Sequence, residues 1–486
     1  MARTTLVLLV LVLVGCTASD PDAGGSDASE PAPTERPAAS SSPSPSEGPM
    51  SEGPTSESPV TEAPTGTASE DPGAADTGAV DSQLAFVLGV LDGAEVDRET
   101  YDERFAQVFT DQLPFEQFAA TLDQVTALAP FTLGEERSRD GSGLVVEATA
   151  SDGTELVITL HVDAEGRIDG LLLSPGEPPT LDEPVTSLQD AVDRLAAMGQ
   201  LHLAASTVEG TTCTTDVGVA ADQPAPIGSA FKLYVLAAVV DAVDAGELAW
   251  TDSVELAESD KSLPSGVLQD RPAGSPVSIA EAAELMISIS DNTATDLLIR
   301  AVGRDAVEAA QAAYGHADPS LNTPFPTTRE LFVLKAADPE VQQAWVDGDE
   351  TTRRAVLDDL AGEPLPPVTT FTGDPVRPAE IEWFASPEDL CRVLAALHVR
   401  FDDPGMAPLR GILTTNPGIP DEEGRWEEIL FKGGSEPGVV AGAFLVTGAE
   451  GGTYALTASV LDPAAPLDEI EAVLLMGAAR DQLPAG

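Results

Sequence analysis

A serine and a lysine three residues apart are the first pair of side chains that could do chemistry. Ser229 and Lys232 stand in the segment Pro226-Ile227-Gly228-Ser229-Ala230-Phe231-Lys232, directly before an apolar run. If Ser229 opens a helix, the two side chains lie one turn apart on one face, and the helix N-terminus directs N–H groups at the serine oxygen. A neutral, desolvated lysine can take the proton that keeps a serine hydroxyl unreactive. The spacing also occurs by chance, so other residues must support it.

A second group, Ser290-Asp291-Asn292, lies between two predicted helices. The first begins at Ser278-Ile279-Ala280-Glu281, which has the pattern of a capping box, and the second covers residues 293–302. The junction would project Ser290 and Asn292 together from a loop. The same three residues can equally serve only to cap the second helix, and both interpretations stay open at this point.

A third group, Phe431-Lys432-Gly433-Gly434-Ser435, leads into a predicted strand at residues 439–446. The glycines would let another group approach the backbone closely, and the lysine would supply positive charge for an anionic substrate. The alternative is a turn with a solvated lysine. Since the chain has only four lysines, their placement is informative; they are Lys232, Lys261, Lys335 and Lys432.

Together the three motifs, in this order, resemble the motif set of class A β-lactamases and penicillin-binding proteins. The resemblance extends over nearly all of residues 186–486. It implies that Ser229 is the acylated nucleophile, that Lys232 is its base and that Ser290 relays a proton to the leaving group.

The same resemblance assigns the substrate-binding residues. Asn292 would hold the side-chain amide of the substrate, and Lys432 would provide positive potential for its carboxylate. Gly434 and Ser435 would also bind the substrate. The backbone N–H groups of Ser229 and Ser435 would then form the oxyanion hole.

Two departures from this motif set affect the expected activity. Gly433 stands where the family usually has threonine or serine, and the Ser435 hydroxyl is a candidate replacement. The Glu-x-x-Leu-Asn stretch that activates the deacylating water is missing: Leu321-Asn322 follows Asp318-Pro319-Ser320, and Glu330, Glu380 and Glu382 lack the motif. We therefore expect an acyl-enzyme that forms but hydrolyses slowly, and weak or no β-lactamase activity.

The segments around these motifs predict a β-lactamase-like domain at residues 186–486, with three layers and an all-helical subdomain. An antiparallel sheet flanked by helices would combine strands from both ends of the domain, and helices would dominate between them. Residues 347–380 are expected to be an insertion. The predicted helices are Leu188–Met198, 327–335, 386–397 and 467–483, and the predicted strands lie at 201–206, around 217, at 439–446 and at Thr453–Leu461.

Residues 82–176 predict a separate small α+β domain. Apolar residues recur at helical spacing between residues 84 and 91 and between residues 101 and 109, and strands follow at 144–146, 156–162 and 168–173. The two-domain arrangement and the segments Pro324–Phe332, Glu382–Pro387 and Phe431–Gly438 resemble the actinobacterial LpqF-type lipoproteins and related proteins encoded in clavulanic acid gene clusters. The resemblance implies an isomerase-like, NTF2-like or cystatin-like fold for this domain, and esterase-type chemistry at the serine.

The N-terminus predicts export and lipid anchoring. Residues 1–16 combine Arg3, an apolar run too short to span a bilayer and Leu13-Val14-Gly15-Cys16, which resembles a lipobox with Cys16 as the lipidation site. Residues 17–81 are rich in Pro, Ser, Gly and acids and predict a disordered linker. We expect an extracytoplasmic lipoprotein that contacts the cell membrane only through its N-terminal lipid; an ordinary signal peptide is the alternative.

Charge and residue usage exclude several classes of function. A net charge of −58 argues against nucleic-acid binding and favours a soluble monomer. The four histidines are scattered and no Cys/His cluster has metal-ligand spacing, so we expect no metal and no cofactor. Cys213 and Cys391 are expected to be buried thiols, although one disulfide between them is possible in an oxidising compartment.

These patterns together predict an envelope-anchored serine hydrolase of the esterase or amidase type. Its partners would be small-molecule esters, amides or β-lactam-like compounds. A D-alanyl-D-alanine carboxypeptidase or a slow β-lactamase is the alternative among enzymes. A non-enzymatic, ligand-binding penicillin-binding fold is the alternative outside them, although such a protein has no reason to retain a nucleophile with its base.

Overall fold

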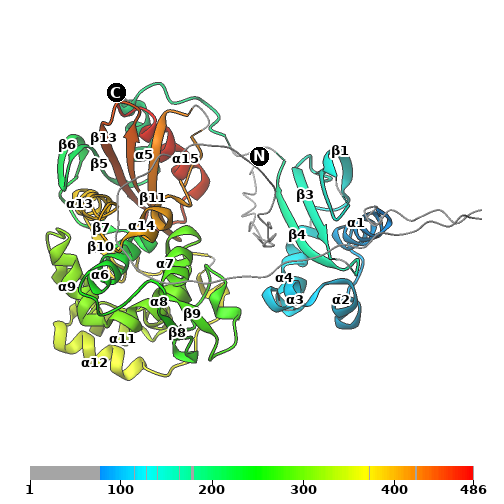
Figure 1. The fold of residues 1–486 in the computed structure, drawn as a ribbon, viewed down its shortest axis with the longest axis horizontal. Coiled ribbons are helices and arrows are strands. Elements are labelled where there is room, and N and C mark those ends of the chain that lie inside the picture. The colour runs from blue at the N-terminus through cyan, green and yellow to red at the C-terminus, as the bar shows by residue number, and fades with distance from the viewer. Residues whose placement is uncertain are drawn as a thin grey trace, which may run out of the picture. The chain divides into compact units, whose positions relative to one another are not determined.

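The computed structural model describes residues 77–113, 115–126, 128–139, 141–163, 165–176, 180–371, 373–421 and 424–484. The predicted signal peptide, Cys16 and most of the predicted linker lie outside these residues. The chain divides into two compact units, residues 1–176 and 177–486 (Figure 1). Within the described residues, no helix is long and apolar enough to cross a membrane.

In the first unit, the described residues pack four helices against a four-stranded antiparallel sheet with the order β1-β2-β3-β4. Its core consists of apolar side chains from one face of the sheet and from the helices, with Phe105, Phe109 and Ile158 almost fully buried. The elements are α1 (Thr77–Leu91), α2 (Arg98–Arg104), α3 (Gln107–Gln112), α4 (Phe115–Thr126), β1 (Thr132–Arg139), β2 (Gly143–Thr149), β3 (Glu155–Val162) and β4 (Ile168–Pro175).

Three features of this unit differ from the predictions. Helix α1 begins at Thr77, inside the range predicted as linker. The helical pattern at residues 101–109 is divided between α2 and α3, because Phe105 and Ala106 leave the helix to bridge Ile168 of β4. Strand β1 was not predicted because all of its side chains are exposed, and a polar edge strand has no alternation to detect.

The second unit contains a five-stranded antiparallel sheet with the order β11-β12-β13-β5-β6. This order confirms that strands from both ends of the domain meet in one sheet. Helices α5 and α15, the first and last helices of this unit, cover one face of the sheet, where Val440, Phe444 and Val446 are buried. Helix α13 covers the other face (Figure 1). These elements are α5 (Leu188–Met198), β5 (Gln200–Glu209), β6 (Thr212–Val219), α13 (Pro387–His398), β11 (Trp426–Glu436), β12 (Val439–Gly448), β13 (Thr453–Leu461) and α15 (Glu469–Arg480).

The rest of this unit is the predicted helical subdomain. Ser386 begins α13 with a capping box, and Thr327 begins α10 in the same way, as their sequences indicate. The segment predicted as an insertion contains a further helix and a 3₁₀ turn. The elements are β7 (Ala225–Pro226), η1 (Gly228–Phe231), α6 (Lys232–Asp244), β8 (Ser253–Glu255), η2 (Glu258–Asp260), η3 (Leu268–Asp270), β9 (Pro276–Ser278), α7 (Ile279–Ser288), α8 (Asn292–Val302), α9 (Arg304–Ala313), η4 (Pro319–Asn322), α10 (Thr328–Ala336), α11 (Pro339–Asp347), α12 (Glu350–Leu360), η5 (Val368–Phe371), β10 (Phe384–Ala385) and α14 (Ala407–Thr414).

Cys213 and Cys391 form a disulfide, so the expectation of two unpaired thiols is wrong. The bond joins β6 to α13, with the two Cα atoms 6.3 Å apart. Helix α13 packs against β5 and β6, and this packing brings together two cysteines that are 178 residues apart in the chain. Only the assembled fold reveals the pairing, because nothing in the local sequence encodes it.

Breaking this disulfide is expected to lower the free energy of unfolding of the second unit by about 2–5 kcal/mol, because the bond closes a long loop in the unfolded chain. Tryptophan fluorescence during urea unfolding measures this unit alone, since all four tryptophans of the chain lie in it. The Cys213→Ser, Cys391→Ala double variant should match the natural protein in reductant. An unfolding midpoint that does not respond to reductant would contradict the expectation.

Candidate active site

Ser229 lies in a tight turn that leads directly into a buried helix. It occupies the 3₁₀ turn η1, and Lys232, whose backbone N–H donates to the Ser229 carbonyl, is the first residue of α6. Gly228 has a φ of +47°, a conformation that glycine adopts most easily. Ser229 is half-buried, and no hydrogen bond within the described residues occupies its hydroxyl group.

The Ser290-Asp291-Asn292 loop both caps a helix and contacts the catalytic lysine candidate. Asp291 is fully buried and caps α8 by accepting a hydrogen bond from the Ala294 N–H at 2.7 Å. Its other oxygen accepts hydrogen bonds from the N–H groups of Val267 and Leu268, which fixes the neighbouring loop. The two interpretations of this motif are therefore compatible, since the cap holds Ser290 beside α6.

Lys232 and Lys432 meet at one hydroxyl group. The Nζ atom of each lysine lies 3.0 Å from Ser290 Oγ. Lys232 Nζ also donates to the Ser290 carbonyl at 2.5 Å and to Asn292 Oδ1 at 2.7 Å. A neutral Lys232 amine has two N–H groups, and both are used by the Ser290 carbonyl oxygen and Asn292 Oδ1. Its lone pair is then available to accept a proton from a hydroxyl group.

Burial shifts the acid–base properties of both lysines in the same direction. Desolvation holds the pKa of Lys232 well below its usual range, and the positive charge of Lys432 adds to this effect, while Asp291 and Asp296 oppose it. Desolvation also lowers the pKa of Lys432 to about 7. A buried lysine with a lowered pKa can be neutral at physiological pH and can therefore act as a base.

Strand β11 brings its glycines against the Ser229 turn. A Cβ atom on Gly434 would lie 2.4 Å from Ser229 N, and one on Gly228 would lie 2.9 Å from Ser435 N. No side chain fits at either position, so the backbones of the turn and the strand touch. The N–H groups of Ser229 and Ser435 thus belong to two segments in direct contact, as an oxyanion hole requires.

The Lys432–Ser435 segment lies within strand β11, so the alternative of a turn with a solvated lysine is wrong, and the segment does not merely lead into the strand predicted at residues 439–446. Regular pairing with β12 places Lys432 and Gly434 on the face toward the helical subdomain. Gly433 and Ser435 lie on the opposite face, where Ser435 is exposed beside Glu469 of α15. A Cβ atom on Gly433 would lie 2.8 Å from the end of the Phe431 ring, so a larger residue there would require this ring to move.

Asn292 is buried, and both of its polar groups already have partners. Its Oδ1 accepts a hydrogen bond from Lys232, and its Nδ2 donates one to the Leu263 carbonyl at 2.9 Å. In this arrangement Asn292 orients the lysine amine. The structure thus brings Ser229, Lys232, Ser290, Asn292, Lys432, Gly434 and Ser435 into one region.

A buried cluster of one lysine and two glutamates lies next to this region and was not predicted. Lys335 of α10 pairs with Glu436, and its Nζ lies 3.7 Å from Glu382 Oε2. Lys335 and Glu382 have almost no exposed side-chain surface. Burial raises the pKa of Glu382 well above its usual range; the Glu436 carboxylate adds to the shift, and Lys335 opposes it.

The cluster connects three segments around the Ser229 turn. Glu436 follows Ser435 in β11 and lies on the same strand face as Gly434. Glu382 precedes Trp383, whose carbonyl accepts a hydrogen bond from Ile227 N at 3.0 Å and whose ring stacks on Phe231 at 3.7 Å. The scarcity of lysines was the one signal in the sequence that singled out Lys335.

No metal site accompanies this arrangement within the described part of the chain. None of its groups of His, Cys, Asp and Glu side chains gathers three members close enough to hold an ion. The chemistry available at the site is therefore that of a serine hydroxyl, two lysines of lowered pKa and a set of backbone N–H groups.

The fold and the site are those of a serine hydrolase of the β-lactamase family. A family model described as "Beta-lactamase enzyme family" matches residues 187–473, and the chain belongs to this family. A second family model, described as "ORF 12 gene product N-terminal", matches residues 75–168. No curated protein sequence matches the chain.

Solved structures are similar to part of the chain at low sequence identity. A β-lactamase from Sphaerobacter thermophilus is 24% identical with a TM-score of 0.44, and the match covers 62% of this chain and 100% of that one. PBP-A is 20% identical with a TM-score of 0.41, over 63% and 99% of the two chains. A β-lactamase from Chitinophaga pinensis is 18% identical with a TM-score of 0.41, over 60% and 96%.

Proposed function

We propose that the protein is an esterase or amidase that works through an acyl-Ser229 intermediate. The observation that carries the proposal is the convergence of Lys232 and Lys432 on Ser290 Oγ, next to the Ser229 turn. Neutral Lys232 takes the proton of the Ser229 hydroxyl while Ser229 Oγ attacks the acyl carbon. The N–H groups of Ser229 and Ser435 stabilise the negative charge on the carbonyl oxygen.

The acylation step ends with loss of the leaving group. As the bond from the acyl carbon to the leaving oxygen or nitrogen breaks, Ser290 donates its proton to the departing atom. Ser290 recovers a proton from Lys232, which lies 3.0 Å away and has just accepted one. Lys432 provides positive charge for a substrate carboxylate, and Asn292 orients Lys232.

Weak or absent β-lactam turnover is a further part of the proposal. The chain lacks the Glu-x-x-Leu-Asn stretch, and Glu382 and Glu436 are engaged with Lys335 in the buried cluster. We further propose that Cys16 carries a lipid that anchors a monomeric protein outside the cytoplasm, as in the LpqF-type lipoproteins. The match of residues 75–168 to the N-terminal part of the ORF 12 gene product supports this two-domain relationship.

Steady-state hydrolysis of a matched substrate panel tests the proposal. Acyl esters and amides should be turned over, penicillins should be hydrolysed far more slowly, and a D-alanyl-D-alanine peptide should not be cleaved. Ser229→Ala should remove the activity. Peptide cleavage would replace the proposal with a carboxypeptidase, and lack of turnover and of covalent labelling with every compound would leave a ligand-binding protein.

The pH dependence of acylation should distinguish the two lysines. Lys432 has a pKa of about 7, so it is charged below pH 7 and loses its charge above. For an ester with a free carboxylate, kcat/KM should fall as the pH rises through about 7. The methyl ester of the same substrate has no carboxylate, so its kcat/KM should not decline over this pH range. In Lys432→Arg the side chain stays charged, so the decline should also disappear for the substrate with the free carboxylate. Identical profiles for acid and methyl ester would contradict the assignment.

A further inference from the structure

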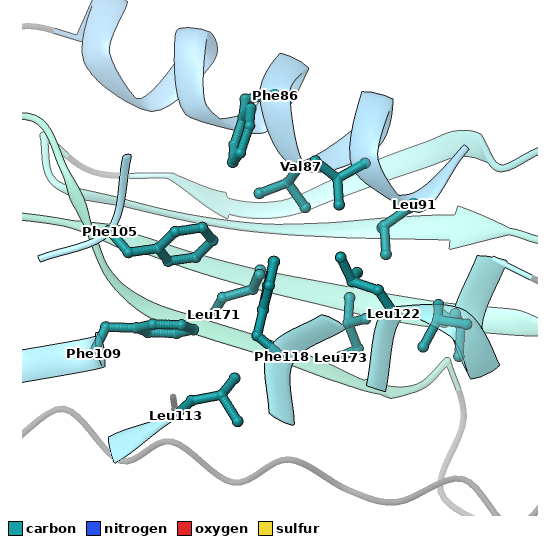
Figure 2. Close-up of a pocket in the computed structure, with 13 residues that line it drawn as sticks. Phe86, Val87, Leu91, Phe105, Phe109, Leu113, Phe118, Leu122, Leu171 and Leu173 are labelled. Atoms are coloured by element: carbon teal, nitrogen blue, oxygen red, sulfur yellow. The ribbon is translucent and has the colours of Figure 1, made fainter. Parts of the chain in front are cut away.

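The first unit contains a cavity whose lining is entirely apolar (Figure 2). It lies between the helices and one face of the sheet and encloses about 60 Å³. Leu171 and Leu173 of β4 form its floor, and the rings of Phe105, Phe109 and Phe118 form a wall. No hydroxyl, amide or charged side chain lines it, so a ligand inside it would make only apolar contacts.

The aromatic wall is packed and preformed. The Phe105 ring stacks on Phe109 at 4.6 Å and meets Phe118 edge-on at 5.1 Å. The nearby Tyr101 hydroxyl is used by the Leu113 carbonyl and offers nothing to a ligand. An unfilled cavity lined by apolar side chains costs stability, which one larger side chain would recover. An apolar ligand would recover the same free energy.

A positive charge lies at the Phe86 end of this cavity. Phe86 is the half-buried lining ring from α1, and the Arg104 guanidinium lies 5.0 Å from its centroid. Among the residues that the structure describes, Arg104 makes no ion pair; it hydrogen-bonds the Gln83 side chain at 3.3 Å.

We propose that this cavity binds the hydrocarbon end of a small carboxylate, such as a medium-chain fatty acid, with Arg104 holding the carboxylate. The cavity accommodates the last carbons of the chain, and the remainder extends past Phe86 to the guanidinium. Binding here involves no bond-making and does not depend on Ser229. The site is therefore independent of the proposed hydrolase activity.

Isothermal titration of the full-length protein with octanoate, and with 1-octanol as the uncharged counterpart, tests the site. Octanoate should bind with one-to-one stoichiometry, and Ser229→Ala should bind it equally well. Leu173→Phe fills the cavity and should weaken binding at least about tenfold. Leu172→Phe changes the neighbouring residue, which faces the other side of β4, and should leave binding unchanged.

The role of Arg104 has its own comparison. Arg104→Gln should weaken octanoate binding about tenfold and leave 1-octanol binding unchanged. If octanoate and octanol bind equally well to both proteins, the assignment of the carboxylate to Arg104 is wrong. If neither compound binds the natural protein and Leu173→Phe melts at a higher temperature, the cavity is only a packing defect and the proposal fails.

Discussion

Replacing Lys232 with methionine should slow acylation of Ser229 by about 10²–10⁴-fold, the usual contribution of a general base. Lys232 is fully buried, and its amine is the basic group that contacts both Ser290 and Asn292. Methionine keeps the length and apolar character of the side chain but cannot accept the proton. The measurement is the pseudo-first-order rate of labelling by a fluorescent penicillin, followed over a range of concentrations.

Lys261→Met is the matched control for this variant. Lys261 is a partly exposed lysine of the same unit that pairs with the exposed Glu258 at 3.4 Å. Its replacement should leave the labelling rate unchanged within about a factor of two and stability within about 0.5 kcal/mol. Unimpaired labelling of folded Lys232→Met would show that another group deprotonates the serine.

The second large effect is expected at the buried cluster. Lys335→Met should lower the free energy of unfolding of the second unit by about 3–5 kcal/mol at pH 7, because it leaves the buried Glu382 and the partly buried Glu436 without their cation. Urea unfolding followed by tryptophan fluorescence measures the loss. Combining the change with Glu436→Gln should restore much of the stability, since one uncompensated charge is then removed.

The loss in Lys335→Met should depend on pH in a defined direction. Glu382 has a raised pKa in the folded protein, so folding favours its protonated form. The stability that such a group contributes is fully present below the pKa that Glu382 has in the unfolded chain. It decreases as the pH rises from that value to the higher pKa that Glu382 has in the folded protein. Removing Lys335 raises the folded pKa further. The deficit should therefore be smallest near pH 4 and largest near pH 8; a deficit independent of pH would contradict this account.

The sequence predicted those parts of the site that are encoded locally. Ser229 and Lys232 share one helical turn, and the Ser278 cap leads through a helix to Ser290, so these relations follow from spacing. The sheet formed by both ends of the domain followed from the strand patterns. These predictions succeeded because the spacing of apolar residues and the capping residues determine helices and strands within a few residues of sequence.

The remaining features depend on contacts between distant segments. The Cys213–Cys391 disulfide and the ion pairs of Lys335 with Glu382 and Glu436 join residues that only the complete fold brings together. Strand β11 was missed because its two glycines weaken the strand pattern, although they are what lets it touch the Ser229 turn. The order of the motifs indicated which residues form the site. The disulfide and the ion pairs that surround the site could be identified only from the structure.

Intact-protein mass spectrometry after exposure to penicillin is the most direct test of an acylatable Ser229. We expect a single covalent adduct with the full mass of the penicillin, located by peptide mapping to the segment that contains Ser229 and lost over a longer time than an ester-derived adduct. Ser229→Ala should show no adduct. An adduct that persists in Ser229→Ala, or the absence of any adduct from the natural protein with penicillins and activated esters alike, would contradict the account.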